Sequence, residues 1–204
     1  MVIRREANAR REEILRAAVD EVARRGLAET RVADVAAALD VSPALIFYHF
    51  ESKERLLAEA FAYAAQEDLR TLEQALARGR SAVDTLRRIL RIYAPLGPAP
   101  AWRLWIEAWA ASLRVPEMRR VSQRLDVHWK EAVAATIEAG VAGGEFTCDD
   151  PAGAAWRITA MLDGLAVQNV AHRGLVTRRQ MRQWVLRHAA AELGVEPALL
   201  TRDA

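Results

Sequence analysis

Apolar residues recur every three or four positions along almost the whole of this 204-residue chain. That spacing matches an α-helix with one face against a core, whereas a half-buried strand needs alternation every two residues. No stretch keeps an alternating pattern between hairpin turns. The chain has only 7 prolines and 10 glycines, so long helices are permitted. The chain is therefore predicted to be all-α.

Caps and helix breakers divide this pattern into about nine helices. Asn8 is expected to cap the first helix and Gly26 to end it, and Thr30 is expected to cap the second, at residues 31–39. Ser42 followed by Pro43 predicts a short third helix that ends near Phe50. The remaining helices are predicted at residues 53–79, 81–94, 101–114, 116–143, 151–173 and 177–193. Ser52 is expected to cap the first of these and Asp150, followed by Pro151, the fifth, while Thr177 and Gln180 have the spacing of a capping box at the start of the last.

Composition excludes several classes of protein. The chain is 52% hydrophobic and 27% charged, which is enough apolar material for a core. No apolar run approaches the ~20 residues that cross a bilayer, and no apolar stretch follows the N-terminal arginines as in a signal peptide. The lone cysteine, Cys148, forms no intrachain disulfide and no zinc cluster. We expect a cytoplasmic protein with no metal and no cofactor.

The net charge of +2 does not by itself indicate a nucleic-acid partner. The charge is distributed unevenly, however, because Arg4, Arg5, Arg10 and Arg11 stand against Glu6 alone in the first eleven positions. Such a basic arm permits contact with phosphate groups or with the minor groove of DNA.

The first three predicted helices are typical of a helix-turn-helix domain, in which a tight turn joins the last two. Residues 31–39 form the supporting helix, 40–42 the turn, and 43–50 the recognition helix. Five apolar side chains are expected to pack inward: Val35, Leu39, Val41, Ile46 and Phe50.

The outward face of the short third helix is small and aromatic rather than charged, which favours a groove-reading role over a solvated one. Pro43, Ala44 and Leu45 offer apolar contact to thymine methyl groups. Tyr48 and His49 are hydrogen-bond donors with the reach of the DNA backbone. Lys53 begins the next helix, where its charge and the helix amides suit a phosphate. The alternative is that Tyr48 and His49 pack one domain against the other.

The segment VADVAAALDVSPALIFYHFESKERLL resembles the helix-turn-helix motif of the TetR family of bacterial regulators. The resemblance implies an all-helical homodimer with a DNA-binding domain at residues 1–52 and a ligand-binding and dimerisation domain at residues 53–204. The DNA-binding residues expected from the motif and from the outward face are Thr30, Ser42, Pro43, Ala44, Leu45, Phe47, Tyr48, His49 and Lys53.

Three positions depart from the family pattern. Asp40 stands where glycine is usual in the turn, and we expect the turn to survive because aspartate tolerates a left-handed backbone. Phe47 replaces the usual tyrosine and so lacks its hydroxyl, and Ala33 stands where some members carry a basic residue. These changes affect which operator sequence is bound rather than the mode of binding.

The second half of the chain is rich in tryptophan. Of 6 tryptophans, Trp102, Trp105 and Trp109 share one face of a predicted helix. Two interpretations are open: the rings pack a core, or they line a cavity for a cationic or planar ligand. The second predicts a ligand-binding set of Trp102, Trp105, Trp109, Trp129, Met161, Gln168 and Asn169.

The second half also resembles the choline-responsive betaine-pathway repressors within the TetR family. The resemblance rests on the segments WRLWIEAWAASLRVPEMRR, HWKEAVAATIEAGVAGGEF and MLDGLAVQNV. It does not identify the ligand of this chain. The last two helices are then expected to form the dimer interface, with Leu165, Trp184 and Val185 in it. For Asp163-Gly164 the purely structural interpretation is a close crossing of two helices, with glycine letting the two backbones approach.

These features predict a ligand-responsive transcriptional regulator, a repressor that binds a palindromic DNA operator as a homodimer and leaves it when a small-molecule effector binds. An enzyme is not expected, because the 4 histidines lack metal-ligand spacing and no phosphate-binding loop follows a strand. An all-helical small-molecule-binding or interaction protein without DNA binding stays open as an alternative, and a gel shift with residues 1–60 discriminates the two.

Overall fold

The computed structural model describes residues 2–93, 100–172 and 174–201, with side chains from residue 8 in the first helix and from residue 102 in the sixth. Within these ranges the chain forms ten helices and no strand, which confirms the all-α prediction. The short last helix was not predicted. The helices are α1 Val2–Arg25, α2 Val32–Ala38, α3 Pro43–Phe50, α4 Lys53–Arg78, α5 Ala82–Tyr93, α6 Pro100–Ser112, α7 Pro116–Ala142, α8 Pro151–Ala171, α9 Arg178–Glu192 and α10 Pro197–Thr201.

Side-chain caps begin four of these helices where the sequence predicted them. Ser42 Oγ accepts from the Leu45 amide at 3.3 Å, and Ser52 Oγ accepts from the Arg55 amide at 3.1 Å. Asp150 caps α8 through the Gly153 amide at 2.9 Å. Thr177 and Gln180 form the expected reciprocal capping box at the start of α9. Because each cap satisfies an otherwise unpaired amide, the start of each helix is determined locally.

Two of the predicted caps are wrong. Asn8 lies inside α1, which begins at Val2. The N-cap of α2 is Arg31 rather than Thr30, whose hydroxyl donates instead to the Gly26 carbonyl at 2.7 Å. Thr30 is 1% exposed, so it fastens the α1–α2 loop from inside the fold.

The chain divides into two compact units. Unit 1 comprises residues 1–68 and 103–125, and unit 2 comprises residues 69–102 and 126–204. The long helices α4 and α7, as well as α6, contribute residues to both. The expected domain boundary at residue 52 stays a prediction.

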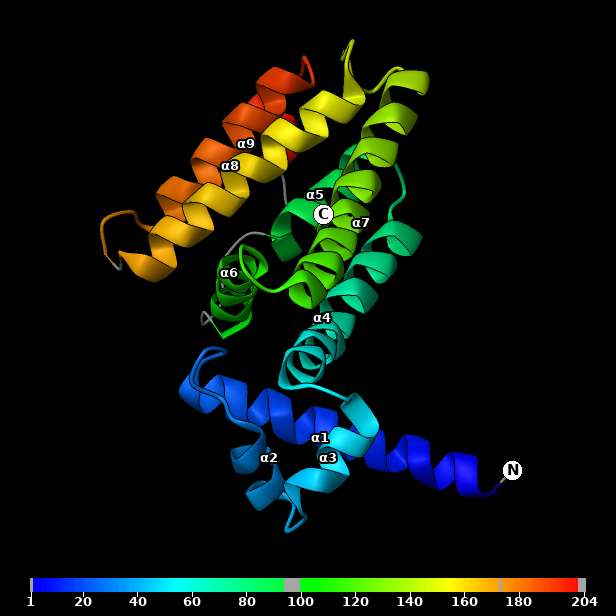
Figure 1. Ribbon diagram of the computed structural model, residues 1–204. Helices are drawn as coiled ribbons and strands as arrows, with labels where there is room; N and C mark the ends of the chain where they lie inside the picture. The colour runs from blue at the N-terminus through cyan, green and yellow to red at the C-terminus, as the bar shows by residue number, and fades with distance from the viewer. Residues whose placement is uncertain (1, 94–99, 173, 202–204) are drawn as a thin grey trace. The chain divides into compact units, whose positions relative to one another are not determined.

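The core of unit 1 joins α1, α2, α3 and the first turns of α4 (Figure 1). Val35, Ile46 and Phe50 are fully buried in it, and Leu39 and Val41 pack against it half-buried. All five inward-facing residues predicted from the sequence therefore lie where they were expected. Packing of these side chains, rather than helix propensity, holds the short helices α2 and α3 in place.

Gly26 permits a close approach within unit 1. It ends α1 with φ +88°, a left-handed conformation suited to glycine. A Cβ atom there would lie 3.2 Å from a carboxylate oxygen of Glu107. That carboxylate accepts the Leu27 amide hydrogen at 2.5 Å, so α6 is tied to the turn after α1.

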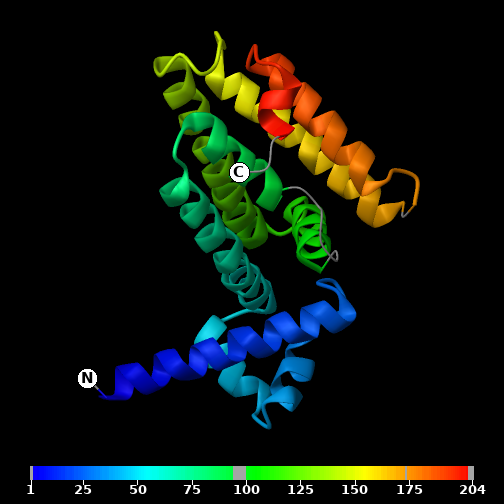
Figure 2. The same cartoon turned by 180° about the vertical axis from the view of Figure 1, so that it is seen from behind.

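In unit 2, α8 and α9 lie side by side, as Figures 1 and 2 both show. Leu86, Ile89 and Ile158 are fully buried in the core of this unit. Glu145 accepts hydrogen bonds from the amides of Ala82 and Val83 and so caps α5 from a distant part of the chain.

No single described helix combines the length and apolar character needed to cross a bilayer, although α2 and α3 pass that test as a bent pair. Across the described ranges, no group of three or more His, Cys, Asp or Glu side chains is placed to hold a metal ion.

Candidate functional sites

The turn between α2 and α3 has the geometry of a helix-turn-helix motif. The two helices are bent by 112° relative to each other, within the ~90–120° range of such motifs. Asp40 adopts φ +52°, the left-handed conformation expected for it in place of glycine. The amide of Val41 donates to the Ala36 carbonyl at 3.0 Å and closes the end of α2. The turn therefore survives the substitution.

The outer face of α3 is apolar and exposed. Tyr48 is 81% exposed and Phe47 44% exposed, and Pro43 and Ala44 are also exposed. Leu45 and His49 are half-buried, and the His49 ring packs edge-on against Tyr48 with centroids 5.3 Å apart. An exposed tyrosine on a two-turn helix has no role in the core of its own unit, which favours contact with a partner.

The basic residues near this face are mostly engaged. Lys53 is the first residue of α4, and its ammonium lies 3.4 Å from the carbonyl oxygen of Ala28 in the α1–α2 loop. Arg10 pairs with Glu13 at 2.7 Å, and Arg11 pairs with Glu59. The side chains of Arg4 and Arg5 lie outside the described residues. Lys53 and Arg10 would have to exchange these partners to meet a DNA phosphate.

The structure divides the predicted tryptophan set between the two units. Trp105 and Trp109 belong to unit 1, with ring centroids 6.0 Å apart. Trp105 also packs edge-on against the buried Phe61 at 5.0 Å, and its indole nitrogen donates to Asp68 at 3.2 Å. Burial raises the pKa of Asp68, and the indole hydrogen bond partly opposes this increase.

Trp102 and Trp129 belong to unit 2, where Tyr93 lies in contact with both rings. The Tyr93 ring meets Trp129 edge-on at 5.0 Å and Trp102 at 5.8 Å. Trp129 is 7% exposed and Tyr93 9% exposed. These three aromatic residues and Asp163 are called the aromatic–acid cluster below.

Asp163 supplies the acid. The Tyr93 hydroxyl donates to Asp163 Oδ1 at 2.8 Å, and the Lys130 ammonium lies 3.9 Å from Asp163 Oδ2. Lys130 is 5% exposed, and it also pairs with Asp126 at 2.5 Å and stands 4.6 Å from the centre of the Trp156 ring. An ammonium group is thus already stabilised in this region by carboxylates and an aromatic face.

Burial changes the proton affinity of the cluster. It raises the pKa of Asp163 to about 6, while the Tyr93 hydrogen bond and the Lys130 charge act in the opposite direction. Burial, followed by the charge of Asp163, also holds the pKa of Tyr93 well above its usual value. A carboxylate that is this costly to keep ionised gains from a second cation.

Among the described residues, no hydrogen bond joins Gln168 or Asn169 to this cluster. Gln168 is exposed, and its amide oxygen lies 3.0 Å from His172 Nδ1 one turn further along α8. Met161 and Asn169 are half-buried on α8. The close crossing considered as a structural role for Gly164 is not formed between the described helices of this chain, since a Cβ atom there would meet no described atom within 4 Å.

The three predicted dimer residues differ in exposure. Trp184 on α9 is 39% exposed and Leu165 on α8 is half-buried. Val185 is 4% exposed, so its own chain already covers it. Trp156 and the open Gly164 add exposed apolar surface to α8 that was not assigned to this interface.

Sequence reasoning missed Tyr93, Asp163 and Lys130 as a group. One sequence feature pointed to Asp163, because it is an acidic residue within the otherwise apolar stretch AMLDGLAV. Such a residue on a buried helix face requires a partner. The identity of that partner was not available, because Tyr93 is 70 positions away.

Comparison with known proteins agrees with this architecture. A family model described as bacterial regulatory proteins, tetR family, matches residues 14–60. A second, described as BetI-type transcriptional repressor, C-terminal, matches residues 82–194. The HTH-type transcriptional regulator BetI of Stenotrophomonas maltophilia is 32% identical over 124 residues, which cover 57% of this chain and 61% of that protein. The chain thus spans about three-fifths of this relative.

Two solved structures are similar over most of the chain. A transcriptional regulator from Saccharomonospora viridis in complex with choline has a TM-score of 0.82 and 28% identity, covering 91% of this chain and 98% of that one. A TetR transcription regulator from Haloarcula marismortui also has a TM-score of 0.82, at 18% identity, covering 91% and 99% of the two chains. At that identity the second similarity concerns the fold alone.

The capped helix-turn-helix in unit 1, together with the two matched regions, defines the class: an all-helical transcriptional regulator rather than an enzyme. Within that class the chain belongs to the TetR family of bacterial regulatory proteins, and its C-terminal half is of the BetI type.

Proposed function

We propose that this protein is a homodimeric repressor that binds a palindromic operator through α3 and leaves it when a small organic cation binds at the aromatic–acid cluster. The observation that carries the DNA-binding part is the exposed face of α3, with Tyr48 81% exposed beside a buried Phe50. A helix held by its inner face and left apolar on its outer face suits the major groove, which admits an α-helix.

The effector part rests on the chemistry of the cluster. Tyr93, Trp102 and Trp129 offer aromatic rings, and Asp163 offers a half-buried carboxylate. Aromatic faces and a carboxylate are together the groups that recognise quaternary ammonium ions. The similar regulator from Saccharomonospora viridis was solved with choline, which supports a quaternary ammonium effector for this chain as well.

A calorimetric titration with choline tests the effector assignment. Asp163→Asn keeps an acceptor for the Tyr93 hydroxyl but removes the charge, and we expect at least about tenfold weaker binding, as for loss of one charge-assisted contact. Asp149→Asn is the matched control, because it removes the same charge from an exposed position of unit 2, and it should bind choline as the wild type does. Equal affinity in the wild type and Asp163→Asn would place the effector elsewhere.

Selection of bound fragments from a pool of genomic DNA tests the operator assignment. Lys53→Ala should weaken every recovered site to a similar degree and reduce the salt slope by about one. Leu45→Ala should instead change which bases are preferred. If Lys53→Ala changes neither affinity nor salt slope, Lys53 makes no phosphate contact.

The dimer assignment rests on the apolar surface of α8 and α9, where Trp156 and Trp184 are exposed. A second copy would cover this surface and present two recognition helices to two half-sites about 34 Å apart. Leu165→Arg should give monomers in sedimentation and abolish operator binding. Leu175→Arg, at a position 76% exposed in the α8–α9 loop, is the control that should remain dimeric.

A further inference from the structure

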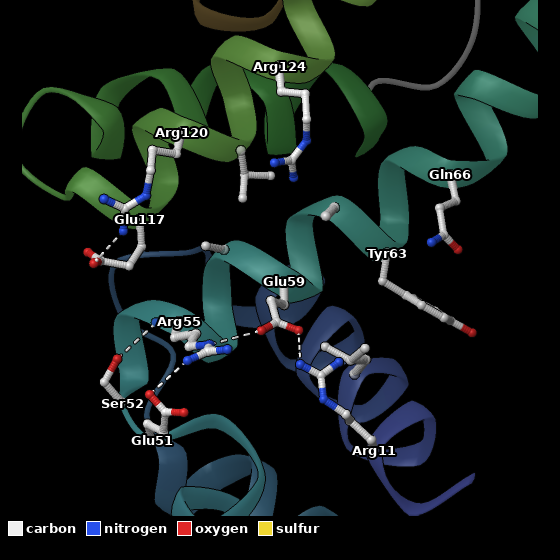
Figure 3. A pocket seen from close by; sticks show the side chains of 14 residues that line it. Arg11, Glu51, Ser52, Arg55, Glu59, Tyr63, Gln66, Glu117, Arg120 and Arg124 are labelled. Carbon is white, nitrogen blue, oxygen red and sulfur yellow. Dashed lines mark hydrogen bonds and ion pairs between the residues drawn. The ribbon is translucent and has the colours of Figure 1, made fainter. Parts of the chain in front are cut away.

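Unit 1 contains a polar cavity that is separate from both proposed sites. It has a volume of about 640 Å³ and lies between α1, α4 and the first turns of α7 (Figure 3). Small-molecule sites typically enclose ~300–1,000 Å³. Part of the lining is apolar, from Leu15, Ala58, Ala62 and Val121. The remainder is dominated by charged side chains.

The acidic groups of the cavity are all neutralised by arginine. Arg55 holds Glu51 at 2.7 Å and Glu59 at 3.2 Å, and Arg11 also pairs with Glu59. Glu117 accepts from Nη2 of Arg120 at 2.9 Å. These glutamates therefore do not make the cavity a site for cations.

Of the four arginines that line the cavity, Arg124 differs from the other three in its pairing. Within the described part of the chain its guanidinium has no hydrogen-bond or ion-pair partner, and Figure 3 shows it pointing into the cavity. Arg120 lies four residues earlier on α7, so both guanidinium groups project from the same helix face. Like charges at this spacing repel each other, and an anion between them would remove that repulsion.

We propose that this cavity binds a compact polyanion, a small molecule with two or more phosphate or carboxylate groups, held by Arg124 and Arg120. The planar guanidinium presents paired donors that match both kinds of oxyanion. Arg120 contacts Glu117 through one terminal nitrogen, which leaves further N–H groups for a ligand.

One residue of the cavity lining also contacts the recognition helix. Arg11, which lines the cavity, also stacks over the ring of Phe50 at 4.6 Å, and Phe50 is the last residue of α3. A polyanion that competes with Glu59 for Arg11 would act on the contact that fixes the end of α3. The site is thus positioned to modulate DNA binding independently of the aromatic–acid cluster.

Calorimetric titration of the full-length protein with pyrophosphate and, separately, with citrate tests the proposal. Sodium chloride at matched ionic strength is the blank. We expect saturable binding of one anion per chain for at least one of the two, and the tighter of them identifies phosphate or carboxylate as the preferred group. In Arg120→Ala/Arg124→Ala the affinity should fall at least about tenfold, because two charge-assisted contacts are lost.

Arg114→Ala is the control, since it removes one guanidinium group from an exposed position of unit 1 outside this cavity. It should bind the anion as the wild type does, and thermal unfolding without anion should show all variants folded. Equal affinity in the wild type and the double variant, or non-saturable binding only, would overturn the proposal. So would loss of DNA binding by Arg124→Ala in anion-free buffer, which would assign these arginines to DNA phosphates.

Discussion

The helix-turn-helix of unit 1 and the aromatic–acid cluster of unit 2 are built in opposite ways. Residues 30–53 contain all the predicted DNA-binding residues of the first site, together with its turn and the caps Ser42 and Ser52. The second site joins Tyr93, Trp129 and Asp163 from three helices, and its central hydrogen bond spans 70 positions. The first is specified by neighbours in the chain, and the second is specified by packing.

The two sites also differ in exposure, and this difference matches their proposed ligands. Tyr48 is 81% exposed, whereas Tyr93 is 9% exposed. A large rigid partner such as DNA is read by side chains that stand outside the fold. A small cation gains most where water is excluded, because electrostatic attraction is stronger at low dielectric constant.

Two aromatic residues of α3 distinguish a role in DNA contact from a role in core packing. Phe50→Ala should lower the free energy of unfolding by about 3–5 kcal/mol, as for other fully buried phenylalanines. Tyr48→Ala should change it by less than about 0.5 kcal/mol, as at other exposed sites, yet weaken operator binding. Urea unfolding and gel shifts on both variants measure this. Comparable destabilisation by the two would show that Tyr48 packs against the fold.

The half-buried Asp163 of unit 2 predicts a pH dependence of stability. The pKa of Asp163 is about 6 in the folded chain, against about 3.9 when unfolded. The folded state therefore holds the proton more tightly, and stability from this carboxyl rises as the pH falls from about 7 to about 4. Between about pH 7.5 and pH 5 the wild type should gain about 1 kcal/mol relative to Asp163→Asn.

Choline binding should show the reverse trend, since it needs the ionised acid. The ionised fraction falls about tenfold between these pH values, and the affinity should fall with it. Unfolding and calorimetry at both pH values, on the wild type and Asp163→Asn, provide the measurement. A pH profile of choline affinity that is flat in the wild type would remove Asp163 from the site.

The capping residues allow the same local rule to be tested in both units. Ser42→Ala in unit 1 and Thr177→Ala in unit 2 should each cost about 1 kcal/mol of unfolding free energy. Thr177→Ala should cost slightly more, because its capping box links two groups rather than one. Differential scanning calorimetry distinguishes them, and no effect from either change would mean that packing alone fixes these helix starts.

The smallest expected effect is a gain at the turn. Asp40 has φ +52°, and glycine adopts this conformation without strain. Asp40→Gly should therefore raise the free energy of unfolding by about 0.5–1 kcal/mol. Ala37→Gly, at an exposed helical position of α2, is the control and should lower it. A loss of stability from Asp40→Gly would show that the aspartate side chain supports the turn.

The sequence by itself determined what depends on neighbours within a few positions. Helical periodicity predicted nine of the ten described helices, and the caps at Ser42, Ser52, Asp150 and Thr177 are where the sequence places them. The helix-turn-helix was predictable for the same reason. Its inward residues and its exposed face follow from helical periodicity in α2 and α3, and its turn follows from the left-handed conformation of Asp40.

Only the tertiary structure decided which distant side chains meet. Helical spacing placed Trp102, Trp105 and Trp109 on one face, yet Trp102 belongs to unit 2 and the other two belong to unit 1. Threonine is a common helix-capping residue, but Thr30 is buried and its hydroxyl donates to the Gly26 carbonyl instead. The partners of Asp163 were likewise not apparent from its neighbours. Helical periodicity specifies which face of a helix is buried, whereas the partner of a buried group depends on the packing of whole helices against one another.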